Sequence, residues 1–599
     1  MLTLLIKEAA VAALQHLYPE QTFAVDMVNV NETKVEFTGD YTLVLFPFVK
    51  MLRCKPDELG KLLGEYLVAN KADLFGGYQV VSGFLNLTVK DDFFVSMLQE
   101  NWHNEQFGKQ QQTNKKVMVE YSSPNTNKPL HFGHLRNIFL GYALGNILKT
   151  AGNEVVKANL INDRGIHICK SMVAWMRYAN GATPQSTGIK GDHLVGDYYV
   201  KFNDIYKAEI AALIANGVEE KQAEKEAPIM QEAQQMLRQW EAGDKEVYSL
   251  WQTMNAWVYE GFEVSYKKLG VDFDKMYYES NTYLLGKAIV EKGLEKGVLF
   301  RKEDNSVWID LTEDGLDQKL LLRGDGTSVY MTQDIGTAVL KYNDFGLDQS
   351  VYVIADEQNY HMQVLKLILK KLGEPCADGI FHLSYGMVEL PTGKMKSREG
   401  TVVDADDMMD EMVRIAQEQT EQAGKADGFS EDELKTLYGT IGMGALKFYL
   451  LRVDPKKRMI FDPKESIDLH GFTATFIQYA HARICSILRK EQIMLMPEAH
   501  HFKGFSATQS LSRSEKEILL ALEQYPEMVK TAATEMSPSV LCNYAFRLAQ
   551  LFNTFYDQHS ISKAENEEKK QLRLMMIIMT AQTLRHTMKM LGIDLPEKM

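Results

Sequence analysis

The sequence is poor in cysteine and lacks a long apolar run. Its five cysteines, none of which belongs to a CxxC pair, are Cys54, Cys169, Cys376, Cys485 and Cys542. This usage indicates neither a disulfide framework nor a zinc site, and it favours a reducing compartment. The longest late apolar run, Leu574 to Met579, is far shorter than the roughly 20 residues that cross a bilayer. The N-terminal segment has no positively charged leader, and Lys7 and Glu8 interrupt its apolar residues. A cytoplasmic protein without a membrane partner is therefore expected.

An excess of basic residues is also missing. The formal net charge is −14, which by itself argues against a polyanionic partner. One tight basic stretch nevertheless contains Lys447, Arg452, Lys456, Lys457 and Arg458. Considered in isolation, a solvated protein face explains this stretch as well as an anion-binding surface does.

The 599 residues are enough for three or four domains of about 100–200 residues each. Residues 1–112 have the pattern of a small α+β module with strands expected at 23–28, 42–46 and 83–89, and residues 105–116 are a polar linker. In residues 113–467, strand-like runs at 117–121, 155–161, 350–356 and 381–390 alternate with helical ones. This alternation predicts a parallel sheet covered by helices, with ligands beyond the carboxyl ends of its strands.

Two further regions have a helical pattern. Residues 181–272 are a charged insertion with little turn punctuation inside the predicted α/β domain, and residues 468–599 are predicted to form an all-α bundle. In the bundle, Ser514 and Glu517 have the spacing of a capping box.

The segment VEYSSPNTNKPLHFGHLRNIFLG, residues 119–141, carries the chemistry. An apolar strand breaks at a Ser-Ser-Pro-Asn sequence, and the chain enters a helix through His131, Gly133 and His134. A helix N-terminus suits a phosphate, and a glycine lets a ring or phosphate approach the backbone. Histidines three residues apart share one face of the first turn, so both imidazoles can donate to charge that develops on one substrate group. Two polar residues that cap a helix are the simpler explanation of a bare HxGH.

These residues resemble the HIGH signature of class I aminoacyl-tRNA synthetases, which opens their Rossmann-like catalytic domain. That family carries a second signature, KMSKS, and GKMKSREGTVV at 393–403 lies far downstream, just after the strand expected at 381–390. Several cations before a glycine suit a clamp on a leaving pyrophosphate. The resemblance implies ATP contacts from His131, Gly133, His134, Lys394, Met395 and Ser397.

The longer string VEYSSPNTNKPLHFGHLRN is similar to the version of the motif in the arginyl-tRNA synthetase family. The resemblance extends over nearly the whole chain, through INDRGIHICKSM, YMTQDIG, FIQYAHARI and LGIDLPEKM. It implies a bacterial-type enzyme of the α/β class, usually a monomer. A Rossmann-like parallel-sheet catalytic domain would lie between an N-terminal α+β domain and a C-terminal all-α anticodon-binding bundle.

The family's arginine pocket implies roles for five residues. Glu120 and Asp334 would hold the guanidinium with Tyr330 beside them, and Asn125 and Gln358 would hold the α-amino and carboxylate end. Guanidinium is planar and always charged, and carboxylates bind it through forked hydrogen bonds. As isolated residues, a strand-end glutamate and a helix-start aspartate have ordinary structural roles. A neutral analogue would leave two buried carboxylates without a partner, so no editing domain is expected.

The implied reaction has two steps. Arginine carboxylate attacks the α-phosphorus of ATP to give arginyl-adenylate and pyrophosphate, and the terminal ribose hydroxyl of tRNA(Arg) then takes the arginyl group. His131 and His134 would stabilise the pentavalent phosphorus, and Mg²⁺ carried with ATP would neutralise the phosphates. No metal site built by the protein is expected.

One position departs from the KMSKS pattern. In register with it, residues 394–398 are Lys-Met-Lys-Ser-Arg, so the second lysine of the signature is replaced by Ser397. Family members that lack this lysine tend to carry one just before the HIGH motif, where Lys128 stands. We hypothesise that Lys128 takes over part of the phosphate contact as a compact charge, although a solvated loop lysine also explains it, and Lys396 is a second candidate. The expected catalytic residues are His131, His134, Lys128, Lys394 and Lys396.

Three regions are expected to contact tRNA by this resemblance. The strand at 83–89 would meet the tRNA elbow, the basic stretch would hold phosphates, and the helix at FIQYAHAR would stack on splayed anticodon bases. Core packing explains the aromatic residues of both elements equally well. The expected contacts are Phe84, Asn86, Lys456, Lys457, Arg458, Tyr479 and Arg483.

Rival functions remain open at this point. A cysteinyl enzyme of the same class would be expected to show zinc-ligand cysteines, and a glutamyl enzyme would present cations to its substrate instead of Glu120 and Asp334. A tRNA-binding homologue without catalysis would not need intact His131, His134 and Lys394. A nucleotidylyltransferase of the same superfamily would not need the helical bundle.

Overall fold

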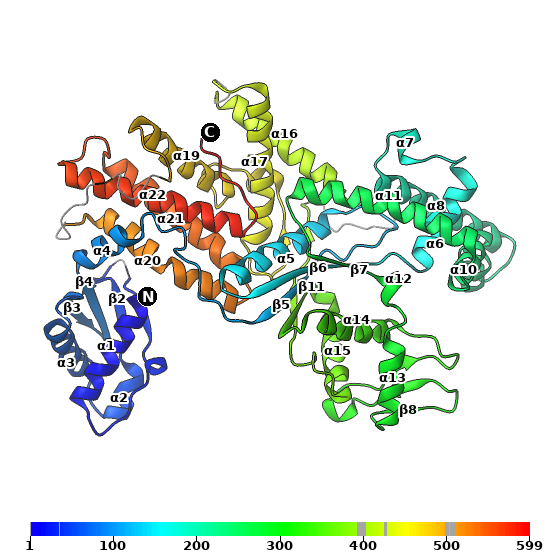
Figure 1. Ribbon diagram of the computed structural model, residues 1–599, viewed down its shortest axis with the longest axis horizontal. Coiled ribbons are helices and arrows are strands. Elements are labelled where there is room, and N and C mark those ends of the chain that lie inside the picture. Colours follow the sequence, from blue (N-terminus) through cyan, green and yellow to red (C-terminus); the bar gives the residue numbers. More distant parts are fainter. Residues whose placement is uncertain (1, 35, 392–402, 425–427, 497–501, 503–509) are drawn as a thin grey trace.

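The computed structural model describes residues 2–34, 36–391, 403–424, 428–496, 502 and 510–599. A five-stranded, all-parallel sheet lies near the centre of the molecule (Figure 1), with the strand order β12-β11-β5-β6-β7. Its strands are β5 (Lys116–Glu120), β6 (Glu154–Ile161), β7 (Lys275–Tyr278), β11 (Gln349–Ala355) and β12 (Ile380–Tyr385). Because both faces of a parallel sheet are covered, its strands can be apolar without alternation, as the Val-Met-Val sequence of β5 is.

The strand order reverses between β5 and β11. The chain runs from β5 to β6 and β7 on one side of the sheet, and then returns to form β11 and β12 on the other. In an open α/β sheet, a ligand crevice lies outside the carboxyl ends of the strands at such a reversal. The connecting helices are α5 (Phe132–Thr150), α6 (Ile166–Tyr178), α14 (Tyr330–Phe345) and α15 (Asn359–Leu372). The predicted α/β class with a parallel sheet is confirmed.

The charged segment between β6 and β7 is helical, as its pattern predicts. After α6 it forms α7 (Pro184–Thr187), α8 (Gly191–Ala215), α9 (Glu220–Glu226), α10 (Pro228–Glu241) and α11 (Lys245–Leu269). The chain then returns through α12 (Glu279–Thr282) and α13 (Gly286–Glu295) to a three-stranded antiparallel sheet. The strands of that sheet are β8 (Leu299–Arg301), β9 (Val307–Ile309) and β10 (Lys319–Leu322).

The N-terminal part is an antiparallel sheet with helices, at one end of the molecule (Figure 1). Its elements are α1 (Leu2–Leu17), β1 (Val30–Glu32), β2 (Tyr41–Val44), α2 (Phe46–Leu52), α3 (Pro56–Asn70), β3 (Phe75–Val81), β4 (Phe84–Val89) and α4 (Asp91–Asn101). The strand expected at 23–28 is wrong, because Val25–Met27 form a 3-10 turn. Of that segment only Phe23 and Val28 are buried hydrophobic residues, so it lacks the alternating buried face of a strand.

The strand expected at 381–390 is interrupted at Gly386. Strand β12 ends at Tyr385, and β13 (Val388–Glu389) pairs instead with β14 (Met459–Ile460). The chain at Gly386 passes so close to the next segment that a Cβ atom there would lie 2.6 Å from the backbone nitrogen of Arg458. A buried guanidinium, that of Arg136 on α5, holds the junction by donating to the carbonyl groups of Gly386 and Lys457, the latter at 2.8 Å.

Apart from β14, the regular elements described after residue 403 are helices. They are α16 (Ala405–Gln422), α17 (Glu431–Leu451), α18 (Pro463–Ser466), α19 (Ala474–Lys490), α20 (Arg513–Thr534), α21 (Ser539–Gln558) and α22 (Glu567–Met590). Helices α19 to α22 pack on one another, and α5 of the central domain packs against α17, α20 and α22. The N-terminal part is joined to the bundle by Lys516, whose ammonium lies 2.9 Å from Asp40 and donates to the carbonyl of Val89. No helix within the described ranges is long and apolar enough to cross a membrane.

The capping box of α20 lies two residues before the predicted one. The hydroxyl of Ser512 accepts from the backbone N–H of Glu515 at 3.3 Å, and the Glu515 carboxylate accepts from the Ser512 N–H at 2.8 Å. Ser514 and Glu517 therefore do not form the box. The reason is tertiary, because the fully buried Glu515 also binds Lys569 at 2.6 Å and Arg573 at 2.8 Å on α22. Burial opposes ionisation of Glu515, but these two cations hold its pKa below the ordinary value.

Glu515→Gln is expected to lower the free energy of unfolding of the bundle by about 3 kcal/mol, because it leaves two buried cations without their carboxylate. Glu517→Gln is the matched control: this side chain is 39% exposed, and its pair with Arg513 is a surface pair, so its effect should stay within about 0.5 kcal/mol. Thermal and urea unfolding followed by circular dichroism measure both. Equal effects of the two substitutions would contradict the assignment of the box to Glu515.

Candidate active site

The loop that leaves β5 is strained at two successive residues. Ser122 and Ser123 have φ angles of 74° and 43°, which residues other than glycine seldom adopt. The backbone N–H of Ser122 donates to Asn137 Oδ1 at 2.6 Å, and that of Ser123 donates to Asn159 Oδ1 at 3.0 Å. Both asparagines are buried. Such strain costs about 1–3 kcal/mol per residue, persists only where the surroundings fix it, and clusters at functional sites. Neither asparagine was predicted; a polar residue inside an apolar helix or strand was the available signal.

The loop then delivers the two histidines to the start of α5. His131 is the N-cap residue, its backbone N–H donates to Nδ1 of His134 at 3.0 Å, and the two imidazole centroids lie 3.8 Å apart. A Cβ atom at position 133 would lie 3.0 Å from Cε1 of His131. Gly133 therefore leaves room for the ring of His131. Because Nδ1 of neutral His134 accepts, its Nε2 carries the proton and is a donor.

Both imidazoles are held neutral. Burial, and then the positive charge of Lys128, lower the pKa of His131 to about 3. Burial also lowers the pKa of His134 well below its ordinary value, with further contributions from His131 and Lys128. The histidines can therefore act near neutral pH as hydrogen-bond donors without a titratable charge. The charge of Lys128 thus contributes to the pKa of both rings.

Lys128 lines a cavity beside the turn at residues 131–134, the HIGH turn. The cavity has a volume of about 230 Å³, and Lys128 shares it with His131, His193 and Asp197 of α8, and Asp404. Burial lowers the pKa of Lys128. A partly desolvated ammonium is a stronger electrostatic partner for phosphate than a solvated one. The reading of Lys128 as a solvated loop lysine does not fit this position.

Four expected ATP contacts and catalytic residues, Lys394, Met395, Lys396 and Ser397, lie outside the described residues.

Glu120 and Asp334 each have a cationic or hydrogen-bonding partner. Glu120, the last residue of β5, forms an ion pair with Lys341 of α14, and both side chains are buried. Asp334 is the fifth residue of α14, so it does not cap that helix, and its Oδ2 lies 2.6 Å from Nε2 of His361. Burial raises the pKa of Asp334, and His361 opposes the shift. Neither Lys341 nor His361 was predicted, because only the fold brings α14, α15 and β5 together.

Tyr330 begins α14, one turn before Asp334. The pKa of its hydroxyl is raised, first by the charge of Asp334, then by burial, and further by Glu279 and Glu120. Glu279, at the start of α12, is therefore a third acidic group near the same phenol, and it was not predicted. Burial raises the pKa of Glu279 to about 7; Arg164 opposes this shift, and the negative charge of Asp334 adds to it.

The two residues expected at the other end of arginine lie at the carboxyl edge of the sheet. Asn125, in the loop after β5, is exposed and forms an isolated parallel bridge with Asn162, which follows β6. Gln358 is exposed and caps the start of α15, three residues beyond the end of β11. These positions flank the reversal of strand order between β5 and β11.

The basic stretch divides into buried and exposed parts. Lys447 is buried, donates to the carbonyl of Gly592, and burial lowers its pKa to about 8. Arg452 pairs with Glu465 at 2.7 Å. Neither cation therefore belongs to the solvated or anion-binding face that the sequence pattern suggests. Residues 456–458 are exposed on the loop held by Arg136, and Arg458 lies 3.7 Å from Asp356.

The expected tRNA contacts outside this stretch differ in exposure. Phe84 is 38% exposed and packs edge-to-face on the exposed Phe46. Asn86 is buried and accepts from Thr42 at 2.6 Å, so its side chain cannot meet an RNA from this position, contrary to expectation. Alternation along β4 would place Asn86 on the same face as the exposed Phe84. Asn86 is buried because it lies in the sheet between Thr42 of β2 and Gln79 of β3.

On α19, the guanidinium of Arg483 lies 4.9 Å from the ring centroids of both Tyr479 and Tyr556. It also donates to Asn553 at 2.8 Å. His481, in the same motif, is fully buried and bonded to the carbonyl of Pro596. Of the motif FIQYAHAR, Phe476, Tyr479 and Arg483 are partly exposed. Tyr556, which was not predicted, is exposed beside Arg483.

Comparison with known proteins places this site in a family. Residues 96–462 match the family described as "tRNA synthetases class I (R), catalytic domain", and residues 477–599 match the "DALR anticodon binding domain". The arginine–tRNA ligase of Bacteroides thetaiotaomicron is 52% identical over 595 residues, covering 99% of this chain and 98% of the relative. That of Amoebophilus asiaticus is 49% identical over 598 residues, covering 100% and 99%.

The fold also matches a solved structure. The arginyl-tRNA synthetase of Thermus thermophilus aligns over the full length of both chains with a TM-score of 0.80 at 24% identity. The HIGH turn at the strand-order reversal, the helical C-terminal region and the end-to-end likeness to these relatives agree. The chain belongs to the class I arginyl-tRNA synthetases.

Proposed function

We propose that this member of the family acts as an arginine–tRNA ligase, which activates arginine with ATP and transfers the arginyl group to tRNA(Arg). The observation that carries the proposal is the arrangement of acidic residues around α14: Asp334 lies one turn after Tyr330 on this helix, and Glu120 pairs with its Lys341. The helix α12, which begins with Glu279, packs against α14, and Glu120 ends the strand that leads to the HIGH turn. A group of carboxylates favours a cationic ligand, and a planar guanidinium can donate forked hydrogen bonds to two of them.

The first step joins arginine to AMP. A carboxylate oxygen of arginine bonds to the α-phosphorus of ATP as the bond to the bridging oxygen of pyrophosphate breaks. Neutral His131 and His134 donate hydrogen bonds to the charge that builds on the α-phosphoryl oxygens, and the ammonium of Lys128 holds a neighbouring phosphate. Mg²⁺ enters with ATP as part of the substrate. Lys394 and Lys396 remain predicted partners of the leaving pyrophosphate.

The second step consumes the adenylate. The terminal ribose hydroxyl of tRNA bonds to the arginyl carbonyl carbon, AMP leaves, and the hydroxyl proton leaves with the products. Support for tRNA as the partner comes from three exposed features: the pair Phe46 and Phe84, residues 456–458, and Arg483 between two tyrosines. Cations hold phosphates, and aromatic rings and guanidinium planes stack on unpaired bases.

ATP–pyrophosphate exchange with each amino acid, with and without bulk tRNA, tests the assignment. Exchange is expected with arginine alone, and Asp334→Asn should lower kcat/KM for arginine about 100-fold, because a buried carboxylate partner of the guanidinium is lost. Asp344→Asn is the matched control on the same helix: Asp344 accepts from Tyr277 at 2.9 Å, and asparagine can still accept. Exchange with any other amino acid would overturn the assignment.

Lys128→Ala is expected to lower kcat for exchange about 100-fold, the effect of removing one preorganised partner of transition-state charge. The KM for arginine should not change, because Lys128 lies beside the histidines and not among the carboxylates. Lys149→Ala is the control, since Lys149 is an exposed cation in the last turn of α5, the helix that His131 caps. Unchanged exchange by the Lys128 variant would refute its role and favour Lys396.

The affinity for arginine is expected to depend on the ionisation of Glu279. Its pKa is raised to about 7, so the group is neutral below that pH and charged above it. Only the charged form attracts guanidinium, so the Kd for arginine should fall about tenfold between roughly pH 6 and pH 8. Calorimetric titration measures this, and Glu279→Gln should remove the slope. An equal slope in both proteins would assign the titration to another group.

A further inference from the structure

The start of α16 is joined to the HIGH turn through the backbone. Phe132 N–H donates to the carbonyl of Val403 at 2.9 Å, and Ala405 N–H donates to the carbonyl of Leu130 at 3.0 Å. His131 and Asp404 face each other in the resulting antiparallel bridge. Any shift of residues 403–405 would therefore be transmitted to the backbone that carries His131.

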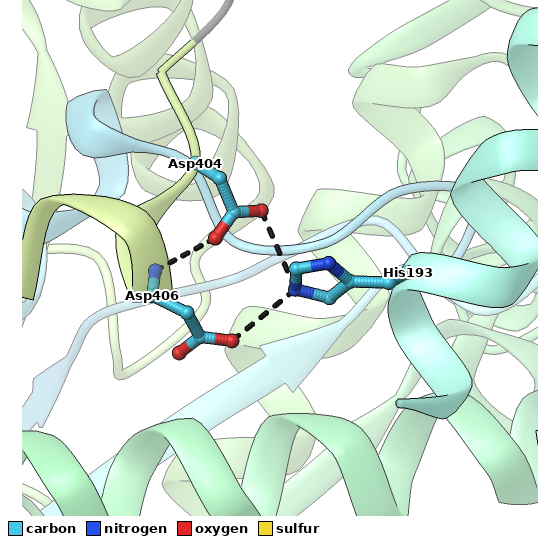
Figure 2. Close-up of side chains that lie close together, drawn as sticks. All are labelled: His193, Asp404 and Asp406. Carbon is cyan, nitrogen blue, oxygen red and sulfur yellow. Dashed lines mark hydrogen bonds and ion pairs between the residues drawn. The ribbon is translucent and has the colours of Figure 1, made fainter. Parts of the chain in front are cut away.

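A side chain from the helical insertion reaches this junction. Figure 2 shows His193, on α8, pointing between Asp404 and Asp406; its Nε2 lies 3.5 Å from the first carboxylate and 3.2 Å from the second. The other oxygen of Asp404 caps α16 by accepting from the N–H of Asp406 at 2.7 Å. His193 thus contacts the residues whose backbone pairs with the HIGH turn.

The carboxylate of Asp406 has further partners besides His193. The ammonium of Lys190, at the N-cap of α8, lies 2.6 Å from Asp406 Oδ2 and 3.0 Å from Asp192. Ser265 of α11 donates to the other oxygen of Asp406 at 3.0 Å. Two helices of the insertion therefore converge on the first turn of α16.

The spacing of His193, Asp404 and Asp406 would also suit a metal ion. The ammonium of Lys190 argues against it, because it already lies on the Asp406 oxygen that such an ion would share with His193. A divalent cation there would be placed against a fixed positive charge. The cluster is an ionic network that the protein completes with its own residues.

The charges around His193 favour its protonated form. The groups that face it are Asp192, Asp197 and Lys190 of α8, and Asp404 and Asp406 at the start of α16, while Lys128 lines the adjoining cavity. Four carboxylates thus outnumber the ammonium of Lys190, which contacts two of them, Asp192 and Asp406. The hydrogen bond to Asp406 is the main cause that raises the pKa of His193, and burial opposes it. The imidazolium is stable below that raised pKa and is lost as the pH rises through it.

We propose that His193 is a positioning residue for adenylate formation: as an imidazolium it clamps Asp404 and Asp406, and thereby keeps residues 403–405 paired with the HIGH turn. The inference rests on the proposed ligase function and deepens it, because it assigns the helical insertion a part in the activation step. The clamp acts through the backbone of His131.

The test is arginine-dependent ATP–pyrophosphate exchange by wild type and His193→Gln across a pH series, with tRNA present. At low pH, His193→Gln should lower kcat about tenfold, the order expected for a small displacement of a catalytic group. The KM for arginine should stay constant. The ratio of the wild-type rate to the variant rate should then fall towards one as the pH rises through the pKa of His193.

His193→Lys provides a permanent cation and is expected to recover most of the rate without that dependence of the ratio on pH. Lys268→Gln is the matched control, because Lys268 also joins α11 to α16, through Asp410 at 2.6 Å, but away from residues 403–406. It should leave kcat unchanged. Thermal unfolding of each variant verifies that the protein is folded.

Three results would overturn the proposal: an unchanged kcat in His193→Gln, a rate ratio that does not vary with pH, or an equal loss in Lys268→Gln. Absence of arginine-dependent exchange in the wild type would instead refute the ligase function. The two failures are therefore distinguishable.

Discussion

The strained turn after β5 is the constraint on which the site depends. If the chain continued in the direction of β5, it would leave the sheet beyond the crevice. The positive φ angles of Ser122 and Ser123 instead turn it towards the start of α5. Hydrogen bonds from their N–H groups to the buried Asn137 and Asn159 hold this path. The path runs from Glu120, in the proposed arginine site, to His131, in the proposed ATP site. The relative placement of these two residues thus follows from one loop conformation that the core enforces.

Charge is arranged differently in the two halves of the crevice. Around the HIGH turn, burial and Lys128 keep the imidazoles neutral, so that they meet a polyphosphate as donors and add no titratable charge. Around Tyr330, carboxyl groups are gathered, and two of them already have partners, Lys341 and His361. These partners offset the cost of burying carboxylates while no ligand is bound. A guanidinium that enters can therefore supplement an existing network and need not neutralise bare charges.

Local patterns in the sequence predicted the candidate site residues but not the residues that hold them in place. The HIGH turn, the parallel sheet and the helical C-terminal region follow from periodicity, from glycine placement and from motif resemblance, because each is encoded within a short stretch. The partners that fix the site are far away along the chain: Lys341 for Glu120, and Arg136 for the loop that carries Lys457. Local patterns also did not predict which polar side chains are exposed, since Asn86 and Lys447 are buried by neighbours from other elements. The capping box of α20 uses Glu515 instead of the predicted Glu517 for the same reason, because Lys569 and Arg573 of α22 pair with the Glu515 carboxylate.

The insertion between β6 and β7 is tied to the catalytic centre more closely than its composition suggests. Charged helices on the outside of a domain usually interact with solvent, and surface pairs contribute little to stability. Here Lys190 and His193 contact the first turn of α16, whose backbone pairs with the HIGH turn. Glu279, which follows the insertion and β7, reaches the carboxyl groups around Tyr330. The segment from α8 to α12 therefore contributes residues to both halves of the crevice. We expect a displacement of α8 and α11 to reach the proposed ATP site through α16, whereas the pairing of β7 with β6 would keep Glu279 in place in the proposed arginine site.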